Sequence, residues 1–249
     1  MEVSKIIPDH LKDTLVEVRY SSQIPFELAI GRFFDALDDT YFYSASSFNQ
    51  PPKFVNSEQR REINFKFEKV CHFASNEIHL ECRPNSFIFN ASRSRDGKTN
   101  YKGWNAYLPK IEDILTTIQG TKVITDYKWL GLRYISEHPD VSLMHACKLD
   151  LKLPQLIGGT LFGHNHKYEI KRSDLNILIS LSELNENNNI ISLIDIDVNK
   201  EIETNPELPD LMNMLDHIHN AEKSIYFDIL KEEYKAEHEI IYSNGNIES

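Results

Sequence analysis

Alternation of apolar and polar residues recurs along the chain and constrains its fold more than any other feature. In Glu77–Arg83 the apolar residues are Ile78, Leu80 and Cys82, and polar or charged residues stand between them. Successive side chains of a strand point to opposite faces, so this pattern predicts a strand with one face on a core and the other in water. Repeated segments of this kind predict an antiparallel sheet.

Other segments follow the same pattern or a helical one. The predicted strands are residues 15–20, 62–68, 77–83, 86–91, 123–135, 163–172, 175–182 and 190–198. Apolar residues at helical spacing predict helices over 25–37, 104–119 and 209–235, with a short helix near 141–147. Residues 41–57, which include Pro51 and Pro52, predict a loop, and residues 239–249 predict a frayed tail.

The order of these segments predicts the fold class. Strands joined by hairpins and closed by helices indicate an α+β fold, in which a large, mainly antiparallel sheet is packed by helices on one face. A strand, a helix, three strands and a helix are followed by a strand, an irregular segment, three strands and a helix. We therefore expect an internal duplication of a four-strand-plus-helix unit, with repeats at 11–120 and 121–235 of a single domain spanning 1–249.

Composition argues against several classes of protein and site. The chain has no apolar run of the roughly 20 residues that a membrane helix needs, and no signal-peptide core at its N-terminus. Three cysteines without a CxxC pair favour a reducing compartment, so we expect a cytoplasmic protein. The 27 Lys and Arg residues against 38 Asp and Glu residues give a net charge of −11, which disfavours nucleic-acid binding.

A motif search gives no nucleotide-binding or catalytic signature, and we expect no cofactor and no membrane partner. Cys82 stands on the apolar side of its predicted strand, which indicates a core thiol rather than a nucleophile. One loop concentrates basic residues next to aromatic ones and is the alternative site for a nucleic acid. This basic-aromatic cluster consists of Arg93, Arg95, Lys98, Tyr101, Lys102 and Trp104.

Two pairs of residues are candidate metal ligands. His164 and His166 stand two apart in one predicted strand, and Asp195 and Asp197 stand two apart in another. Each pair shares a face of its strand, so neighbouring strands would bring four ligands together. The alternative interpretation is that these residues are polar groups on the solvent face of the sheet.

A second set of residues predicts a groove for a ligand or a partner. Glu17 and Arg19 share a face of the first strand, and Trp129 and Arg133 share a face of the fifth. An arginine between aromatic neighbours and paired with a carboxylate makes either a structural salt bridge or a polar anchor of a binding groove. The full set is Glu17, Arg19, Trp104, Tyr107, Trp129, Arg133 and Tyr134.

Five short segments occur in a fixed order along the chain. They are Leu15-Val-Glu-Val-Arg19, Tyr101-Lys-Gly-Trp-Asn-Ala-Tyr107, Gly131-Leu-Arg-Tyr-Ile135, Leu193-Ile-Asp-Ile-Asp197 and Leu215-Asp-His-Ile-His219. Together they resemble a sporadically distributed bacterial protein family of similar length and unknown function, from about residue 10 to about residue 235. The chain departs from that family before the first strand, where the family has a proline-rich lead-in. The patchy distribution of the family implies accessory genes of mobile islands.

From these observations we expect a non-catalytic protein-interaction module, acting as an accessory or neutralising subunit of a bacterial conflict or defence system. The acidic chain would suit a basic protein partner encoded nearby. Two alternatives stay open. One is a small-ligand binder with a cavity between sheet and helix, and the other is a metal-dependent enzyme that uses His164, His166, Asp195 and Asp197. Assembly of the chain with copies of itself is compatible with each of them.

Overall fold

A nine-stranded antiparallel sheet dominates the computed structural model, which describes residues 3–7, 10–37, 41–49, 53–57, 60–64, 67–91, 101–148, 163–186, 189–242 and 247–248. The strand order is β10-β11-β12-β9-β2-β8-β7-β6-β3. The strands of the first half of the chain are β2 (Leu11–Ser22), β3 (Phe42–Asn49), β6 (Phe67–Ala74), β7 (His79–Arg83) and β8 (Ser86–Asn90). Those of the second half are β9 (Ile124–Pro139), β10 (Gly163–Arg172), β11 (Leu175–Glu186) and β12 (Asn189–Glu201).

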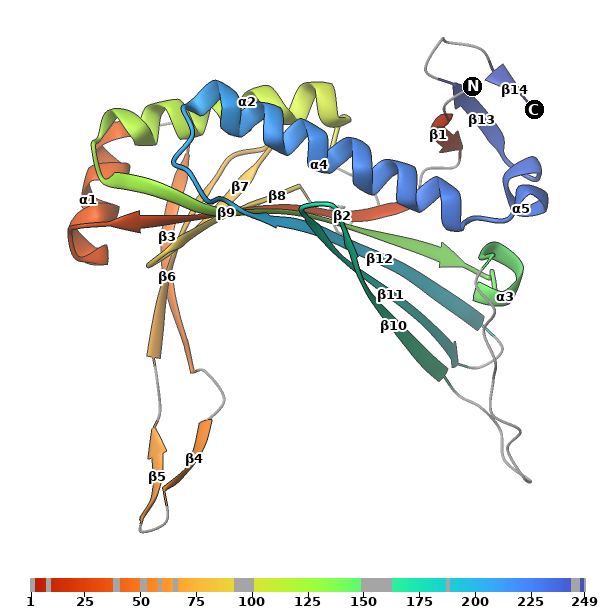
Figure 1. Cartoon of the computed structure of the whole chain (residues 1–249), viewed down its shortest axis with the longest axis horizontal. Coiled ribbons are helices and arrows are strands. Elements are labelled where there is room, and N and C mark those ends of the chain that lie inside the picture. The colour runs from red at the N-terminus through yellow and green to blue at the C-terminus, as the bar shows by residue number, and fades with distance from the viewer. Residues whose placement is uncertain are drawn as a thin grey trace.

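In the part of the chain that the structure describes, five helices pack against the sheet, and the predicted α+β class is confirmed. They are α1 (Phe26–Ala36), α2 (Trp104–Gly120), α3 (Leu143–Ala146), α4 (Leu208–Ile229) and α5 (Glu232–Ala236). In Figure 1, α1, α2 and α4 lie along one face of the sheet, which we call the covered face. The opposite face, on which no helix lies among the described residues, is the open face.

The core lies between the covered face and the helices. Val16 and Val18 of β2 and Leu130 and Leu132 of β9 are fully buried there. The stripe predicted for residues 104–119 faces them, because α2 buries Trp104, Tyr107, Ile111, Ile114, Leu115 and Ile118. The alternation in the sequence therefore predicts correctly which side of each central strand enters the core.

The two halves of the chain share a topology. β2 and β9 are the first sheet strands of their halves and pair with each other at the centre of the sheet. The last strand of each half returns beside the first, because β8 pairs with β2 and β12 pairs with β9. A duplication would produce this arrangement, although among the described residues the first half contributes five strands to the sheet and the second four. The duplication itself stays a prediction.

Several boundaries differ from those predicted. The predicted loop at 41–57 contains β3 and also β4 (Lys53–Ser57), which pairs only with β5 (Arg60–Asn64) among the described residues. The predicted helix 209–235 is two helices, since Leu230 and Lys231 have extended backbones and Leu230 bridges Cys147. The predicted frayed tail contains β13 (Glu239–Tyr242) and β14 (Ile247–Glu248), and β13 pairs with β1 (Val3–Ile7).

None of the helices described by the structure has the length and apolar character needed to cross a membrane.

Candidate functional site

The structure separates the seven predicted groove residues into two groups. Four of them point to the open face of β2 and β9: Glu17, Arg19, Trp129 and Arg133. Their buried neighbours along the same strands, Val16, Val18, Leu130 and Leu132, point to the covered face. Trp104, Tyr107 and Tyr134 belong to the covered side and to the core around α2 and α4. The open face therefore contains four of the predicted residues, and the side chains of the other three lie between the covered face and the helices.

On the open face, Arg19 joins an acid to an aromatic ring. Its guanidinium Nε donates a hydrogen bond of 2.7 Å to the Glu17 carboxylate, and its Cζ lies 4.1 Å from the centre of the Trp129 ring. Arg19 and Trp129 are also cross-strand partners in the pairing of β2 with β9. A guanidinium held over an indole face in this way gains a cation–π interaction.

The Trp129 ring can lie against the backbone at residue 131 because that residue is glycine and has no side chain. A Cβ added to Gly131 would lie 2.3 Å from Cη2 of the Trp129 ring, which is far inside van der Waals contact. The ring therefore lies across the backbone of its own strand, over Gly131, whose cross-strand partner is Glu17. Glycine is required at this position by the close approach of the ring.

Arg133 makes a second charged pair beside this stack. Its Nε and Nη2 donate hydrogen bonds of 2.8 and 2.6 Å to the two oxygens of Asp195, which is a bidentate geometry. The direct cross-strand partner of Arg133 is Asp197. Burial raises the pKa of the Asp197 carboxyl, and a hydrogen bond donated by Asn199 and the charge of Arg133 partly oppose that rise.

These residues form one patch across β2, β9 and β12. We name Glu17, Arg19, Trp129, Arg133, Asp195 and Asp197 the open-face cluster. The sequence predicted the first four as a groove and the two aspartates as metal ligands, and register brings all six to the same face. The cluster presents an aromatic platform with charged donors and acceptors, which suits recognition of another molecule's polar groups.

The remaining groove residues belong to a buried polar network. The Tyr134 hydroxyl is hydrogen bonded to the Tyr101 hydroxyl at 2.8 Å and to Nδ1 of His219 at 3.0 Å. The Trp104 indole donates a 2.8 Å hydrogen bond to Asp216, and its ring stacks on His219 at 4.5 Å. Burial lowers the pKa of His219 to about 4, so its imidazole stays neutral inside this network.

The sequence analysis did not single out Glu222, a residue of α4 that lies near Tyr134 of β9. Its side chain is 1% exposed, and burial raises the pKa of its carboxyl well above the usual value. The signal was present, because Glu222 continues the stripe of Leu215 and Ile218 that faces the sheet. The interior beneath α4 is therefore polar at a position where the helical pattern requires an apolar residue.

The predicted metal site is wrong, because its two pairs of ligands lie on opposite faces. His164 and His166 are cross-strand partners of Glu183 and Leu181, on the side of β10 and β11 that continues the covered face. Asp195 and Asp197 point to the open face. Within the described ranges, no group of three or more His, Cys, Asp or Glu side chains is placed to hold a metal ion.

The other chemical candidates lie in the core, outside the described residues or in a surface ion pair. Cys71, Cys82 and Cys147 are buried free thiols, and burial raises the pKa of Cys147 to about 12. Arg93, Arg95 and Lys98 of the basic-aromatic cluster lie outside the described residues. Lys102 of that cluster forms an ion pair of 2.8 Å with Glu77.

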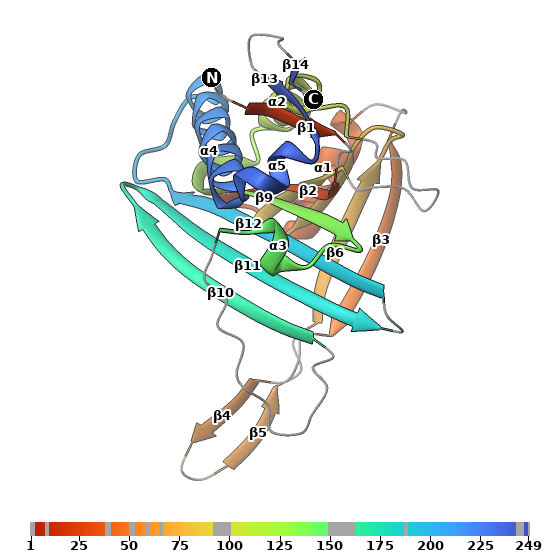
Figure 2. The ribbon, with the colours of Figure 1, turned by 90° about the vertical axis from the view of Figure 1, so that its right-hand side faces the viewer.

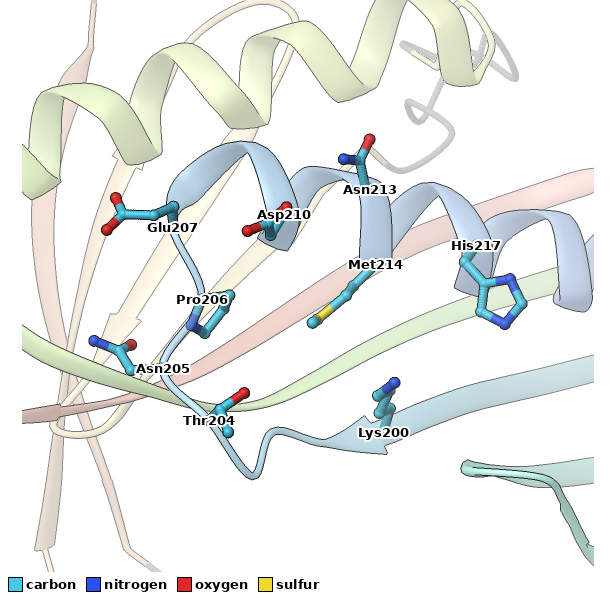
Figure 3. Close-up of a pocket in the computed structure, with 9 residues that line it drawn as sticks. All are labelled: Lys200, Thr204, Asn205, Pro206, Glu207, Asp210, Asn213, Met214 and His217. Carbon is cyan, nitrogen blue, oxygen red and sulfur yellow. The ribbon is translucent and has the colours of Figure 1, made fainter.

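A pocket of about 520 Å³ opens beside the N-terminal half of α4, and none of the predicted groove residues lines it. Figure 3 shows its lining residues, which come from the end of β12, the following loop and α4. Two of its polar groups are already engaged. Lys200 forms an ion pair with Asp174, and Asn205 bonds the backbone of Tyr127 and Thr125. The pocket therefore gives less support for a binding function than the open-face cluster.

No family model matches the chain, and no curated protein matches its sequence. The resemblance to a sporadically distributed bacterial family stays a prediction.

Proposed function

We propose that this protein is a non-catalytic interaction module that binds a basic protein partner on the open face of its sheet. The observation that supports this most is the stack of Arg19 on Trp129, built over Gly131 on a sheet face that no described helix covers. Tryptophan and arginine are the residues that contribute most binding energy at protein interfaces. A purely solvated face would not need a glycine to seat an indole ring.

Apolar residues on the same face support an interface. Leu184 and Ile191 are cross-strand partners on β11 and β12 and are 51% and 39% exposed. Leu193 lies between Ile191 and Asp195 on β12, and Leu15 and Ile135 are cross-strand partners of Arg133 and Asp195. All three are only partly buried. Apolar side chains mixed with paired charges are typical of the surface of one protein that another covers.

Charge favours a basic partner. The open-face cluster contains three carboxylates and two guanidinium groups, and both arginines bond carboxylates other than Asp197. Burial raises the pKa of Asp197, and an approaching lysine or arginine would lower it. The net charge of −11 over the whole chain would also accelerate encounter with a basic protein.

The biological setting that we propose comes from the family resemblance. We place the protein in the cytoplasm, as an accessory or neutralising subunit of a bacterial conflict or defence system. A gene encoded nearby would then supply the basic partner.

Site-specific photo-crosslinking in the native host tests this function. A benzoylphenylalanine placed at Ser180 on the open face should yield an adduct with a basic protein, identified by mass spectrometry. The same group at Glu112, exposed on α2, is the control and should not yield it. Asp197→Lys should abolish the adduct, and Glu112→Lys should leave it unchanged. Equal adducts from both positions, or an acidic partner, would contradict the proposal.

A further inference from the structure

Three histidine rings meet where the two ends of the described chain join the main sheet. His10 lies between β1 and β2, His138 is close to the end of β9, and His238 lies between α5 and β13. The ring centres of His10 and His138 are 4.4 Å apart, and those of His10 and His238 are 5.7 Å apart. In Figures 1 and 2, β1 and β13 lie beside α5, at one end of the molecule.

His138 is fully buried, and both of its ring nitrogens lie near tyrosine hydroxyls. Its Nδ1 is hydrogen bonded at 2.8 Å to the hydroxyl of Tyr234 from α5, and its Nε2 lies 3.5 Å from the hydroxyl of Tyr226 from α4. Tyr234 is 1% exposed, and the centre of its ring lies 4.5 Å from that of His238, with the two rings tilted. The segment from α5 to β13 therefore meets the end of β9 through tilted and edge-to-face contacts between these rings.

The charged groups near this cluster have other partners. Glu237 bonds His145, Glu137 forms an ion pair with Lys12, and Lys235 forms one with Glu232. Burial lowers the pKa of His138 to about 3, and the neighbouring His10 and His238 lower it further rather than raise it. The closed arrangement therefore stabilises a neutral imidazole and opposes its protonation.

We propose that His10, His138 and His238 form an acid-sensitive latch that holds the terminal unit, comprising α5, β13 and β1, against the sheet. When the unit separates, His138 reaches water and takes up a proton at its ordinary pKa of 6.5. Because the pKa is lower in the closed form, the latch has full strength above pH 6.5 and weakens as the pH falls toward 3. Opening would expose Tyr234 and the end of β9 to a partner or a protease.

The size of the effect follows from the two pKa values. Between pH 7.5 and 5.5, protonation of His138 in the open form alone should raise the opening equilibrium about tenfold.

Hydrogen–deuterium exchange at both pH values, expressed as protection factors that correct for intrinsic exchange, tests the latch. Protection over Glu232–Tyr242 should fall about tenfold at the lower pH, while protection over β11 should hold. His138→Gln should reduce the fall to threefold or less, and His217→Gln, an exposed histidine of α4, should leave it unchanged.

Two results would overturn the latch. One is an equal loss of protection over β11, which would mean that acid destabilises the whole fold. The other comes from the unmodified protein, where an NMR titration of the His138 ring should show a neutral imidazole down to pH 4.5. A midpoint near pH 6.5 would remove the basis of the latch even if His138→Gln failed to fold.

Discussion

On β9, Leu130 and Leu132 point to the covered face and are fully buried, whereas Trp129 and Arg133 point to the open face and keep contact with water. A single strand thus contributes residues both to the core and to the open-face cluster. The covered face gains its free energy from buried apolar area, which is not directional. The open face instead fixes geometry through a ring seated on glycine and a bidentate ion pair. Substitutions on the two faces should therefore have effects of different size and kind.

The largest effect is expected on the covered face. Leu132→Ala removes a fully buried side chain and should lower the free energy of unfolding by about 2–5 kcal/mol. Arg133→Ala, one residue along on the open face, should change it by about 1 kcal/mol or less, because surface ion pairs contribute little. Urea denaturation of both variants measures the contrast. Equal losses would mean that the open face contributes to stability as a core does.

A change of opposite sign is expected at the polar position of the covered face. Glu222→Gln should raise the free energy of unfolding by about 1–3 kcal/mol at pH 7. The folded state raises the pKa of this acid, so the wild-type protein is most stable below the ordinary value of 4.5 and loses stability as the pH rises. The free energy of unfolding of the Glu222→Gln variant should not fall in this way as the pH rises.

Thermal unfolding followed from pH 5 to 8 measures this difference, and Glu112→Gln on the exposed side of α2 is the control. A less stable Glu222→Gln variant would show that the carboxylate is charged and stabilised inside the protein. The contrast between an apolar covered face and a charged open face would then break down beneath α4.

A smaller effect is expected where the Trp129 ring meets its own strand. Gly131→Ala should cost about 1–2 kcal/mol, because the added Cβ displaces the ring and separates it from Arg19. Gly31→Ala in α1 is the matched control, since a Cβ there meets nothing within 4 Å. That control should gain about 0.5–1 kcal/mol from higher helix propensity. An unchanged NMR signal of the Trp129 indole in Gly131→Ala would contradict the seating of the ring.

Local patterns predicted the side of each central strand, and they failed where pairing between distant segments decides. β3 consists largely of small and polar residues and forms by pairing with β6, so its own composition indicates a loop. The break at Leu230 involves neither proline nor glycine, and depends on a backbone bridge to Cys147. Neither contact leaves a periodic signal in the sequence.

The candidate site shows the same limit. Glu17, Arg19, Trp129 and Arg133 were predicted together because period-two spacing assigns residues of one strand to one face. Trp104 and Tyr107 come from a helix, and nothing in a sequence states which face of a sheet a helix will cover. His164 and His166 share the side of β10 that carries Tyr168 and Ile170, whereas Asp195 and Asp197 stand on the side of β12 opposite the buried Ile194 and Ile196. Spacing within each strand groups each pair correctly, but the metal prediction did not compare which face each strand turns to the core.

The pairing of β1 with β13 has a mechanical consequence. The strands run antiparallel, with Val3 opposite Tyr242 at one end of the pair and Ile7 opposite Glu239 at the other. Tension that pulls Val3 and Tyr242 apart therefore breaks the hydrogen bonds between the strands one after another. Such unzipping requires little force, and it would load the terminal unit before any tension reaches the nine-stranded sheet. A neighbour tethered at either end could therefore pull this unit open while the sheet stays intact.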